Sequence, residues 1–275
     1  MSFSVLMSVY LKEKSQYLNE ALFSIWDQQT LKPDQIVLVK DGPLTEELDN
    51  CINVWKIKLN DYLTLVELPV NVGLGAALNE GLKQCKYELV ARMDTDDISL
   101  PNRFEKQIEF MEKNPDIVLL SGYINEFINK INKNINIRKV PLEYKKIIRY
   151  LKYRNAFNHM AVIFKKKAVI SVGGYSSMLS YFEDYDLWIK LTQAKYMISN
   201  IPDVLVNVRI GNNMIDRRHG IGYAKKEILF FKIQKERGFL SLYEYYFIMF
   251  LRVPVRMIPL NILGFFYFLL RNKYL

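Results

Sequence analysis

Three carboxylates follow an apolar stretch of this chain within four residues: Asp94, Asp96 and Asp97. Carboxylates this close repel one another unless a cation lies among them, and Mg²⁺ and Mn²⁺ prefer such oxygen ligands. A cation held there would in turn attract phosphate oxygens, so the cluster predicts a metal-bridged nucleotide diphosphate. The alternative is a solvated acidic turn that caps the next helix, because Asp is favoured at helix N-termini.

The element that must hold this cluster is residues 87–93, whose apolar pattern predicts a strand. Upstream, strand and helix signals alternate, which predicts an α/β fold with a doubly wound, mostly parallel sheet covered by helices on both faces. Ligands bind such sheets at the carboxyl ends of the strands. Tyr10, Asp41 and Asp94 all stand at predicted strand ends. The predicted strands are 4–10, 35–40 and 63–68, and the predicted helices are 16–28, 45–59 and a segment from a loop at 71–75 to residue 85.

The composition points to an anionic partner, because the formal net charge of the 275 residues is +9. Diphosphate substrates and an anionic membrane surface both qualify. The chain has no zinc-finger spacing, no RNA-binding aromatic motif and no helix-turn-helix signal, so nucleic acid is not expected as a partner. Cys51 and Cys85 lie far apart, which favours reduced thiols in the cytoplasm over a disulfide framework. The first residues lack the basic segment of a signal peptide.

The character of the chain changes after about residue 205, which predicts a main domain at 1–205 and a C-terminal extension at 206–275. Aromatic and aliphatic residues dominate 242–270, but the longest uncharged part, 257–270, is shorter than the roughly 20 residues that span a bilayer. Helices lying on a membrane surface, flanked by Lys and Arg, therefore fit better. The alternative is packing on the core or in a dimer interface. Residues 125–138 are expected to form a mobile excursion.

An ordered series of motifs resembles family 2 glycosyltransferases of the GT-A fold, over roughly residues 3–220. The likeness is strongest to bacterial enzymes that build O-antigen, capsule or exopolysaccharide repeat units, including amylovoran-type transferases. Each motif alone is weak, but their order and spacing together are specific. The motifs are Ser8-Val9-Tyr10, Val39-Lys40-Asp41-Gly42, Asn71-x-Gly73-Leu74-Gly75-x-Ala77-x-Asn79, Arg92-x-Asp94-Thr95-Asp96-Asp97, Pro101-x-Arg103, Gly173-Gly174-Tyr175, Glu183-Asp184-Tyr185-Asp186-Leu187-Trp188 and Arg217-Arg218.

The resemblance implies a nucleotide pocket lined by Ser8 and Tyr10, with Asp41 accepting a hydrogen bond from the base. A carboxylate facing an imide N–H favours uracil. Lys40 departs from the acidic residue that many members carry before the Asp-Gly pair, which leaves the base contacts open.

The resemblance also assigns the acidic cluster. Arg92 and Asp94 to Asp97 would hold ribose, metal and diphosphate, with Asp96 or Asp97 as the direct ligand of Mn²⁺ or Mg²⁺. The glycine-rich loop at 71–75 lacks the Lys-Ser/Thr of a phosphate-binding Walker loop and is expected to form a turn near the donor.

Asp184 is the implied catalytic base. Inverting transfer is a single in-line displacement that needs one carboxylate to deprotonate the acceptor hydroxyl, while a metal ion takes up the charge of the leaving diphosphate. The neighbouring Glu183 is a candidate contact for acceptor or phosphate. The alternative is an acidic first helix turn favoured by the macrodipole, and both descriptions can hold together.

Three further residues are candidates for acceptor or phosphate contacts. Arg217 and Arg218 could clamp a diphosphate, since guanidinium groups bind phosphate bidentately; a solvated basic face is the alternative. His159 aligns with a position where members often carry His before Pro, although Met160 stands in the place of that Pro. A core histidine is the alternative for His159.

The implied enzyme is an inverting, metal-dependent hexosyltransferase. It would move a hexose, preferably from UDP-glucose or UDP-galactose, to a polyprenyl-diphosphate-linked glycan at the inner face of the cytoplasmic membrane. A sugar nucleotidyltransferase is an alternative, but the first strand is followed by Lys12-Glu13-Lys14 without the glycine-rich loop of that class. A nucleotide-sugar-binding scaffold without turnover is a third possibility, against which the intact Asp94, Asp96, Asp97 and Asp184 argue.

Overall fold

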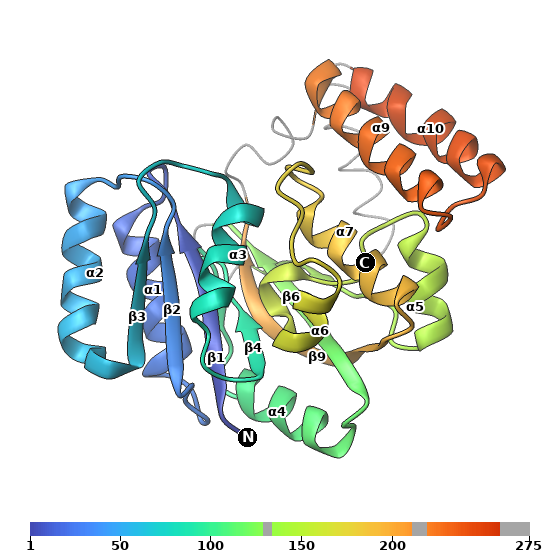
Figure 1. Cartoon of the computed structure of the whole chain (residues 1–275). Helices are drawn as coiled ribbons and strands as arrows, with labels where there is room; N and C mark the ends of the chain where they lie inside the picture. The colour runs from blue at the N-terminus through green and yellow to red at the C-terminus, as the bar shows by residue number, and fades with distance from the viewer. Residues whose placement is uncertain (129–133, 211–218, 259–275) are drawn as a thin grey trace. The chain divides into compact units, whose positions relative to one another are not determined.

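The computed structural model describes residues 1–128, 134–210 and 219–258 (Figure 1). It divides into two compact units, Met1–Arg209 and Ile210–Leu275, which we describe separately. The first unit ends with its last strand, so it extends past the boundary expected at residue 205.

The first unit is built on one sheet of nine strands in the order β3-β2-β1-β4-β8-β6-β9-β5, with β7 paired to β6. Pairing is parallel across β3, β2, β1 and β4, and again between β6 and β9, while β8 runs antiparallel to both of its neighbours. The strands are β1 (Phe3–Val9), β2 (Gln35–Lys40), β3 (Leu63–Glu67), β4 (Leu89–Arg92), β5 (Ile98–Ser99), β6 (Ile117–Phe127), β7 (Asn134–Arg138), β8 (Ile163–Lys165) and β9 (Met197–Arg209).

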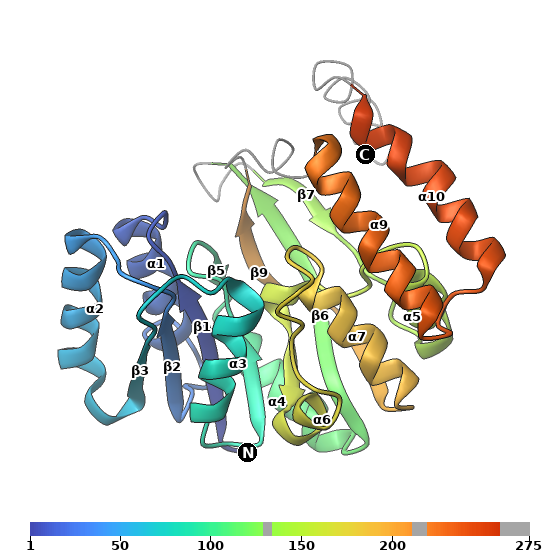
Figure 2. The same cartoon turned by 45° about the horizontal axis from the view of Figure 1, so that its top comes forward.

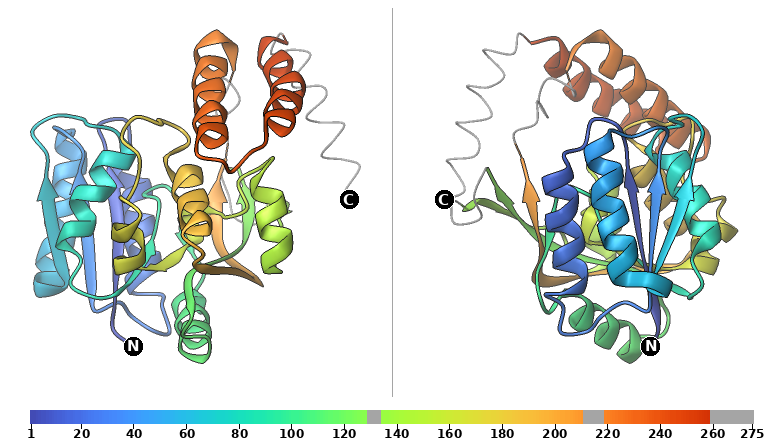
Figure 3. Two further views of the ribbon diagram at one scale, coloured as in Figure 1. Left: turned by 45° about the vertical axis from the view of Figure 1, so that its right-hand side comes forward. Right: turned by 90° about the vertical axis from the view of Figure 1, so that its left-hand side faces the viewer.

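Helices cover both faces of this sheet, as the sequence predicts. Around β1 to β3, α1 and α2 lie on one face and α3 on the other (Figure 3). The helices are α1 (Ser15–Trp26), α2 (Glu46–Leu59), α3 (Leu74–Gln84), α4 (Arg103–Lys113), α5 (Tyr144–Leu151), α6 (Lys166–Ser171) and α7 (Glu183–Gln193), with 3₁₀ turns at Asn60–Tyr62 and His159–Ala161.

Local sequence explains the elements that position the site. Six of the seven residues of β1 are buried, as expected for a central parallel strand covered on both faces. The hydroxyl of Thr45 accepts a hydrogen bond from the amide of Leu48, and acidic residues fill the first turn of α2, which suits its dipole. A Cβ at Gly81 would lie 2.5 Å from side-chain atoms of Leu6 and Val39, so this glycine lets α3 pack closely on β1 and β2.

The mobile excursion expected at 125–138 is wrong for most of its length. Asn125 to Phe127 complete β6, and β7 pairs with β6 in an antiparallel ladder. The side-chain amide of Asn125 donates to the side-chain oxygen of Asn207 on β9 at 2.8 Å, so polar side chains here connect neighbouring strands. Residues 129–133 lie outside the described part.

The second unit contains α9 (Gly220–Glu236) and α10 (Leu242–Met257), which lie side by side (Figure 2). A capping box starts α10: the hydroxyl of Ser241 accepts from the amide of Glu244, whose carboxylate accepts from the amide of Ser241. Among the helices that the structure describes, none is both long enough and apolar enough to cross a membrane.

Candidate active site

The carboxyl ends of β2, β1 and β4 are neighbours in the sheet, and the predicted site residues follow them. Asp41 comes directly after β2, Tyr10 directly after β1, and Asp94 two residues after β4. Ser8 lies in β1 itself and is half-buried, while Tyr10 is 38% exposed. The parallel order therefore brings to one edge residues that are far apart in the chain.

The acidic cluster gathers as predicted. One carboxylate oxygen each from Asp94, Asp96 and Asp97 lies within 4.8 Å of the others. Asp94 is ion-paired with Arg92, and Asp97 accepts a hydrogen bond from the backbone amide of Arg209 at 2.8 Å. These residues do not cap a helix, because the next one, α4, begins only at Arg103.

The electrostatics of the cluster favour a divalent cation. Burial, and then the charges of Asp94 and Glu13, raise the pKa of Asp96 to about 7. Burial and the charges of Asp96 and Asp94 raise the pKa of Asp97. Three carboxylates that destabilise one another when ionised form a hard oxygen donor set, so the residues present fit Mn²⁺ or Mg²⁺.

Residues that sequence analysis missed surround the cluster. The guanidinium of Arg209 donates to the backbone oxygen of Asp96 at 3.1 Å, pairs with Glu20 at 2.6 Å and lies 3.9 Å from the ring centre of Tyr17. Arg209 is 112 residues from Asp97, and no local motif marks it. The end of β9 and helix α1 thus hold the cluster in place together.

Glu13 is a fourth carboxylate beside the cluster. Its side chain accepts from the hydroxyl of Thr95 at 3.1 Å and from the amide of Lys14 at 2.8 Å. Burial raises the pKa of Glu13, and the nearby negative charge of Asp94 adds to that effect. The only signal in the sequence is an acidic residue shortly after the end of β1.

Asp41 is buried, and its carboxylate is used by the chain itself. It accepts from the amide of Val72 at 2.7 Å, from the amide of Gly73 at 3.1 Å and from the side chain of Asn71 at 3.0 Å. Asp41 therefore holds the loop before α3, a role that the sequence analysis did not predict. Lys40, the departure from the family pattern, pairs with Asp49 and Glu67 at 2.7 and 3.1 Å.

A buried polar group connects the cluster to the candidate base. Arg92 is 2% exposed, and its Nε and Nη1 atoms have no hydrogen-bond partner among the described residues. The charges of Arg92, Asp184, Glu183 and Asp94 all act on the Tyr175 hydroxyl, whose pKa is raised above all by burial. Tyr175 is therefore near both the acidic cluster and the carboxylates of α7.

His159 is buried, and its contact with acceptor or phosphate stays a prediction. Its Nε2 atom is 3.0 Å from the hydroxyl of Tyr175, and its ring packs edge-on against Trp188. Burial, and then the charge of Arg92, hold the pKa of His159 well below its usual range. The neutral ring lacks the charge that would attract a phosphate.

Glu183 and Asp184 begin α7, where carboxylates suit the macrodipole, and the catalytic role of Asp184 stays a prediction. Asp184 is half-buried and accepts from the side chain of Asn155 and from the amide of Tyr185, both at 2.7 Å. Glu183 is buried, and its Oε2 atom has no hydrogen-bond partner among the described residues. Of the pair, Asp184 is the more accessible carboxylate, and its two hydrogen bonds fix its orientation.

The glycine-rich motif and the Gly-Gly-Tyr motif hold this end of α7. The side chain of Asn79 donates to the backbone oxygen of Tyr175 at 2.8 Å and accepts from its amide at 2.9 Å. A Cβ at Gly75 would lie 2.7 Å from the oxygen of Ser176 and 3.1 Å from the Cβ of Glu183. The two motifs are therefore one latch, which brings the start of α3 against the segment that leads to the candidate base.

Asn79→Ala is expected to lower the free energy of unfolding by about 3 kcal/mol, because it leaves two buried backbone groups of Tyr175 unpaired. Urea denaturation followed by circular dichroism measures this. Asn50→Ala, at an exposed position of α2, is the matched control and should change stability by less than about 0.5 kcal/mol. Equal losses in both variants would mean that the latch contributes nothing.

Glu183 gives a prediction of pH dependence. Burial, and then the charge of Asp184, raise its pKa from an ordinary value of 4.5 to about 7. Between these values the folded chain binds more protons than the unfolded chain, so this group makes stability fall as pH rises. Glu183→Gln removes that loss and is expected to stabilise the protein by about 2 kcal/mol more at pH 8 than at pH 5.

Urea denaturation at the two pH values tests this prediction. Glu109→Gln, at an exposed position of α4, should show no such difference between pH 5 and pH 8. A Glu183→Gln effect that does not change with pH would contradict the assigned burial of the carboxyl group.

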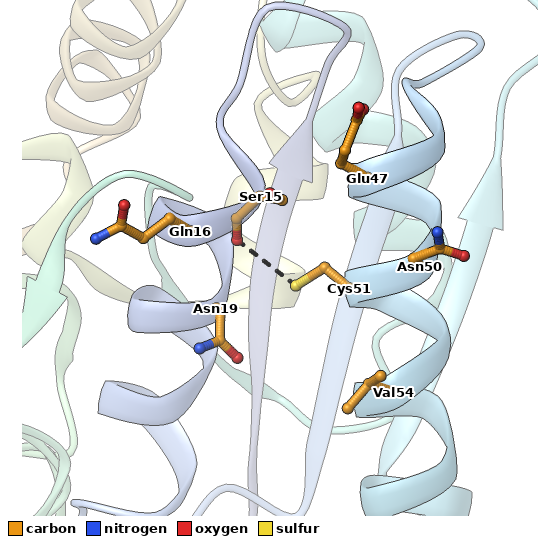
Figure 4. A pocket seen from close by; sticks show the side chains of 7 residues that line it. All are labelled: Ser15, Gln16, Asn19, Glu47, Asn50, Cys51 and Val54. Carbon is orange, nitrogen blue, oxygen red and sulfur yellow. Dashed lines mark hydrogen bonds between the residues drawn. The ribbon is translucent and has the colours of Figure 1, made fainter.

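Arg217 and Arg218 lie outside the described residues, so their predicted phosphate contacts stay predictions. A surface pocket between α1 and α2 contains none of the predicted site residues (Figure 4). There, the thiol of Cys51 donates to the backbone oxygen of Ser15 at 3.6 Å. The chemistry-bearing residues gather instead at the carboxyl edge of the sheet and at the start of α7.

Comparison with known proteins identifies the family. Residues 4–172 match the family model described as Glycosyl transferase family 2. The chain is 42% identical over 268 residues to the amylovoran biosynthesis glycosyltransferase AmsE of Erwinia amylovora, covering 96% of this chain and 97% of that protein. It is 41% identical over 266 residues to an Escherichia coli UDP-Gal:alpha-D-GlcNAc-diphosphoundecaprenol beta-1,3-galactosyltransferase, covering 96% of this chain and 94% of that protein.

Solved structures share the fold. S. aureus TarS in complex with UDP-GlcNAc aligns with a TM-score of 0.65 at 19% identity, covering 90% of this chain and 70% of that one. The mannosyltransferase PcManGT from Pyrobaculum calidifontis, in complex with GDP-Man and Mn²⁺, aligns with a TM-score of 0.58 at 18% identity. The alignment covers 82% of this chain and 59% of that one. These likenesses confirm the GT-A architecture that the sequence predicts. The chain belongs to glycosyl transferase family 2 and is a glycosyltransferase.

Proposed function

We propose that this enzyme transfers a hexose, glucose or galactose, from a UDP-sugar to a growing glycan carried on a polyprenyl diphosphate, with inversion at the anomeric carbon. One observation carries the proposal. The Asp94, Asp96 and Asp97 carboxylates converge within 4.8 Å, and the two hydrogen bonds between Asn79 and Tyr175 bring α3 against the segment that leads to Asp184; this supports one site for donor and candidate base. An acidic cluster and a pair of carboxylates in one site suit a reaction between two polar substrates, the donor and the acceptor.

Asp184 takes the proton of the acceptor hydroxyl in the proposed reaction. The acceptor oxygen forms a bond to the anomeric carbon as the bond from that carbon to the diphosphate oxygen breaks, and its electron pair leaves with the diphosphate. Asn155 and the Tyr185 amide, each at 2.7 Å, orient the carboxylate of Asp184 for this step. Arg92 places Asp94 through its ion pair. A bound Mn²⁺ or Mg²⁺ would supply a Lewis acid that stabilises the leaving charge, held by Asp96 and Asp97.

The donor and acceptor classes rest on the relatives. The E. coli relative is named for UDP-Gal and for a diphosphoundecaprenol-linked acceptor. TarS was crystallised with UDP-GlcNAc, which supports a UDP-sugar donor in general terms. A lipid-linked acceptor places the reaction at a membrane, so we propose peripheral attachment at the inner face of the cytoplasmic membrane and no nucleic-acid partner. Ser8 and Tyr10 are proposed to line the nucleotide pocket.

A donor screen tests the proposal. Purified protein would be given each nucleotide sugar with Mn²⁺ and a synthetic lipid-diphosphate monosaccharide, with and without EDTA. Transfer from one UDP-sugar that EDTA abolishes is the expected result. UDP binding without any transfer would favour a scaffold that does not turn over, and neither binding nor transfer would contradict the assignment of the donor site.

A further inference from the structure

Helix α10 exposes an apolar side, which is unusual for a helix of a protein in water. A continuous stripe of its surface is apolar and exposed, and Tyr243 and Phe250 are 78% and 77% exposed. The rings of Tyr243 and Phe247 stack on this stripe, with their centres 6.2 Å apart. We call the stripe the α10 face; its residues recur at helical spacing and are Tyr243, Tyr246, Phe247, Phe250, Pro254 and Met257.

Arg252 and Arg256 of α10 contact α9. Glu227 of α9 is fully buried, at 0% exposed, and binds both Arg252 and Arg256. The Nε atom of Arg252 donates to one oxygen of Glu227 at 2.8 Å, and that of Arg256 donates to the other at 2.9 Å. Contacts with the two arginines lower the pKa of Glu227 against the opposing effect of burial. The hairpin therefore encloses the carboxylate of Glu227, while the aromatic side chains of the α10 face are exposed.

An exposed aromatic surface of this kind requires a covering partner. Three properties favour an anionic lipid surface. Residues 219–258 carry seven Lys or Arg and three Glu, so the hairpin is cationic. The two tyrosines of the face have an apolar ring and a polar tip, which suits the headgroup region. The 16 residues of α10 are shorter than the roughly 20 that span a bilayer, so the helix would lie along the surface.

We infer that the α10 face docks on an anionic bilayer surface, inserting its aromatic side chains among the lipids while the Glu227 ion pairs hold α9 and α10 together. The inference rests on the proposed function for its biological setting, since a lipid-linked acceptor is presented at a membrane. It specifies which side chains enter the lipid, and it gives Arg252 and Arg256 a structural role, because both bind Glu227.

Flotation of the full chain with vesicles tests the inference. Vesicles of phosphatidylglycerol and phosphatidylethanolamine are compared with vesicles of phosphatidylcholine alone. The double variant Phe247→Ser/Phe250→Ser is expected to reduce partition into the anionic vesicles by about tenfold or more, because two aromatic side chains no longer bury in the lipid. Val54→Ser/Ile57→Ser, at apolar positions of α2 that are 64% and 84% exposed, is the matched control and should leave partition unchanged.

The other possible coverings give different results. If the double variant binds vesicles as tightly as the native chain, the inference is wrong. If the variant instead converts a dimer to a monomer without lipid, or loses thermal stability while vesicle binding is unchanged, the face belongs to a second copy or to residues 259–275. Transfer to a short-chain, water-soluble lipid-diphosphate acceptor should be the same in native and variant chains. If the native chain binds vesicles but does not transfer sugar to the short-chain acceptor, the proposed function is wrong, and the inference about the α10 face is unaffected.

Discussion

Asp184→Asn is expected to lower the rate of sugar transfer by about a thousandfold while UDP binding is retained, because general-base catalysis contributes on the order of 10² to 10⁴. Asparagine has nearly the same shape, but its neutral amide cannot accept the proton of the acceptor hydroxyl. Asp184 is half-buried, and the side-chain oxygen of asparagine can still accept a hydrogen bond from Asn155 or from the Tyr185 amide, so the fold should tolerate the change. Steady-state kinetics should show the loss in kcat, with little change in KM for the donor.

Glu183→Gln is the matched comparison for this prediction. The two carboxylates are neighbours on the first turn of α7, but Glu183 is buried and Asp184 is half-buried. If Asp184 is the base, only its variant should lose the acidic limb of the pH dependence of kcat/KM. Full transfer activity in Asp184→Asn would exclude Asp184 as the base. A larger loss in Glu183→Gln would assign that role to Glu183.

The fold could be predicted because its signals are local. Each strand from β1 to β4 is a short apolar run that ends in turn residues, and each intervening helix has apolar residues at helical spacing. The alternation alone implies a parallel sheet, and its carboxyl edge then gathers Tyr10, Asp41 and Asp94. The excursion expected at 125–138 failed because a run of Asn, Ile and Lys resembles a loop, whereas these residues pair in β6 and β7.

The parts of the site that could not be predicted depend on contacts between distant segments. Asn79 binds the backbone of Tyr175 across 96 positions, and Arg209 binds Asp97 across 112. Asn79 belongs to a recognisable motif and Arg209 to none, and no spacing rule gives the partner of either residue. Burial was equally hidden: the sequence does not show that His159 is buried against Tyr175 and Trp188.

The same reasoning applies to the second unit. The sequence shows that 242–270 is aromatic and interrupted by arginines, and flanking arginines on a membrane surface are the usual interpretation of that pattern. Arg252 and Arg256 are four residues apart in the sequence, and helical spacing therefore places them on one side of α10. Only the structure shows that this side faces Glu227, because Glu227 belongs to another helix.

Asp96→Asn is expected to weaken Mn²⁺ binding by on the order of 100-fold or more, since even the loss of a group that supports a metal ligand costs about 10- to 100-fold. Asp94 is ion-paired with Arg92, and Asp97 accepts from the amide of Arg209. The carboxylate of Asp96 receives no hydrogen bond from another residue within the described ranges, so among the three it is the candidate ligand with the least competition from protein donors. Titration calorimetry of Mn²⁺ into the protein, with and without UDP, measures the affinity.

Thermal unfolding provides the second measurement for Asp96→Asn. Removing one of three crowded negative charges should stabilise the metal-free protein, while the stabilisation that the native chain gains from Mn²⁺ should disappear. Asp116→Asn, at an exposed position, is the control and should keep the response of the native chain. Unchanged Mn²⁺ affinity in Asp96→Asn, together with weakened affinity in Asp97→Asn, would make Asp97 the direct ligand. Unchanged affinity in both variants would show that the cluster does not bind the metal.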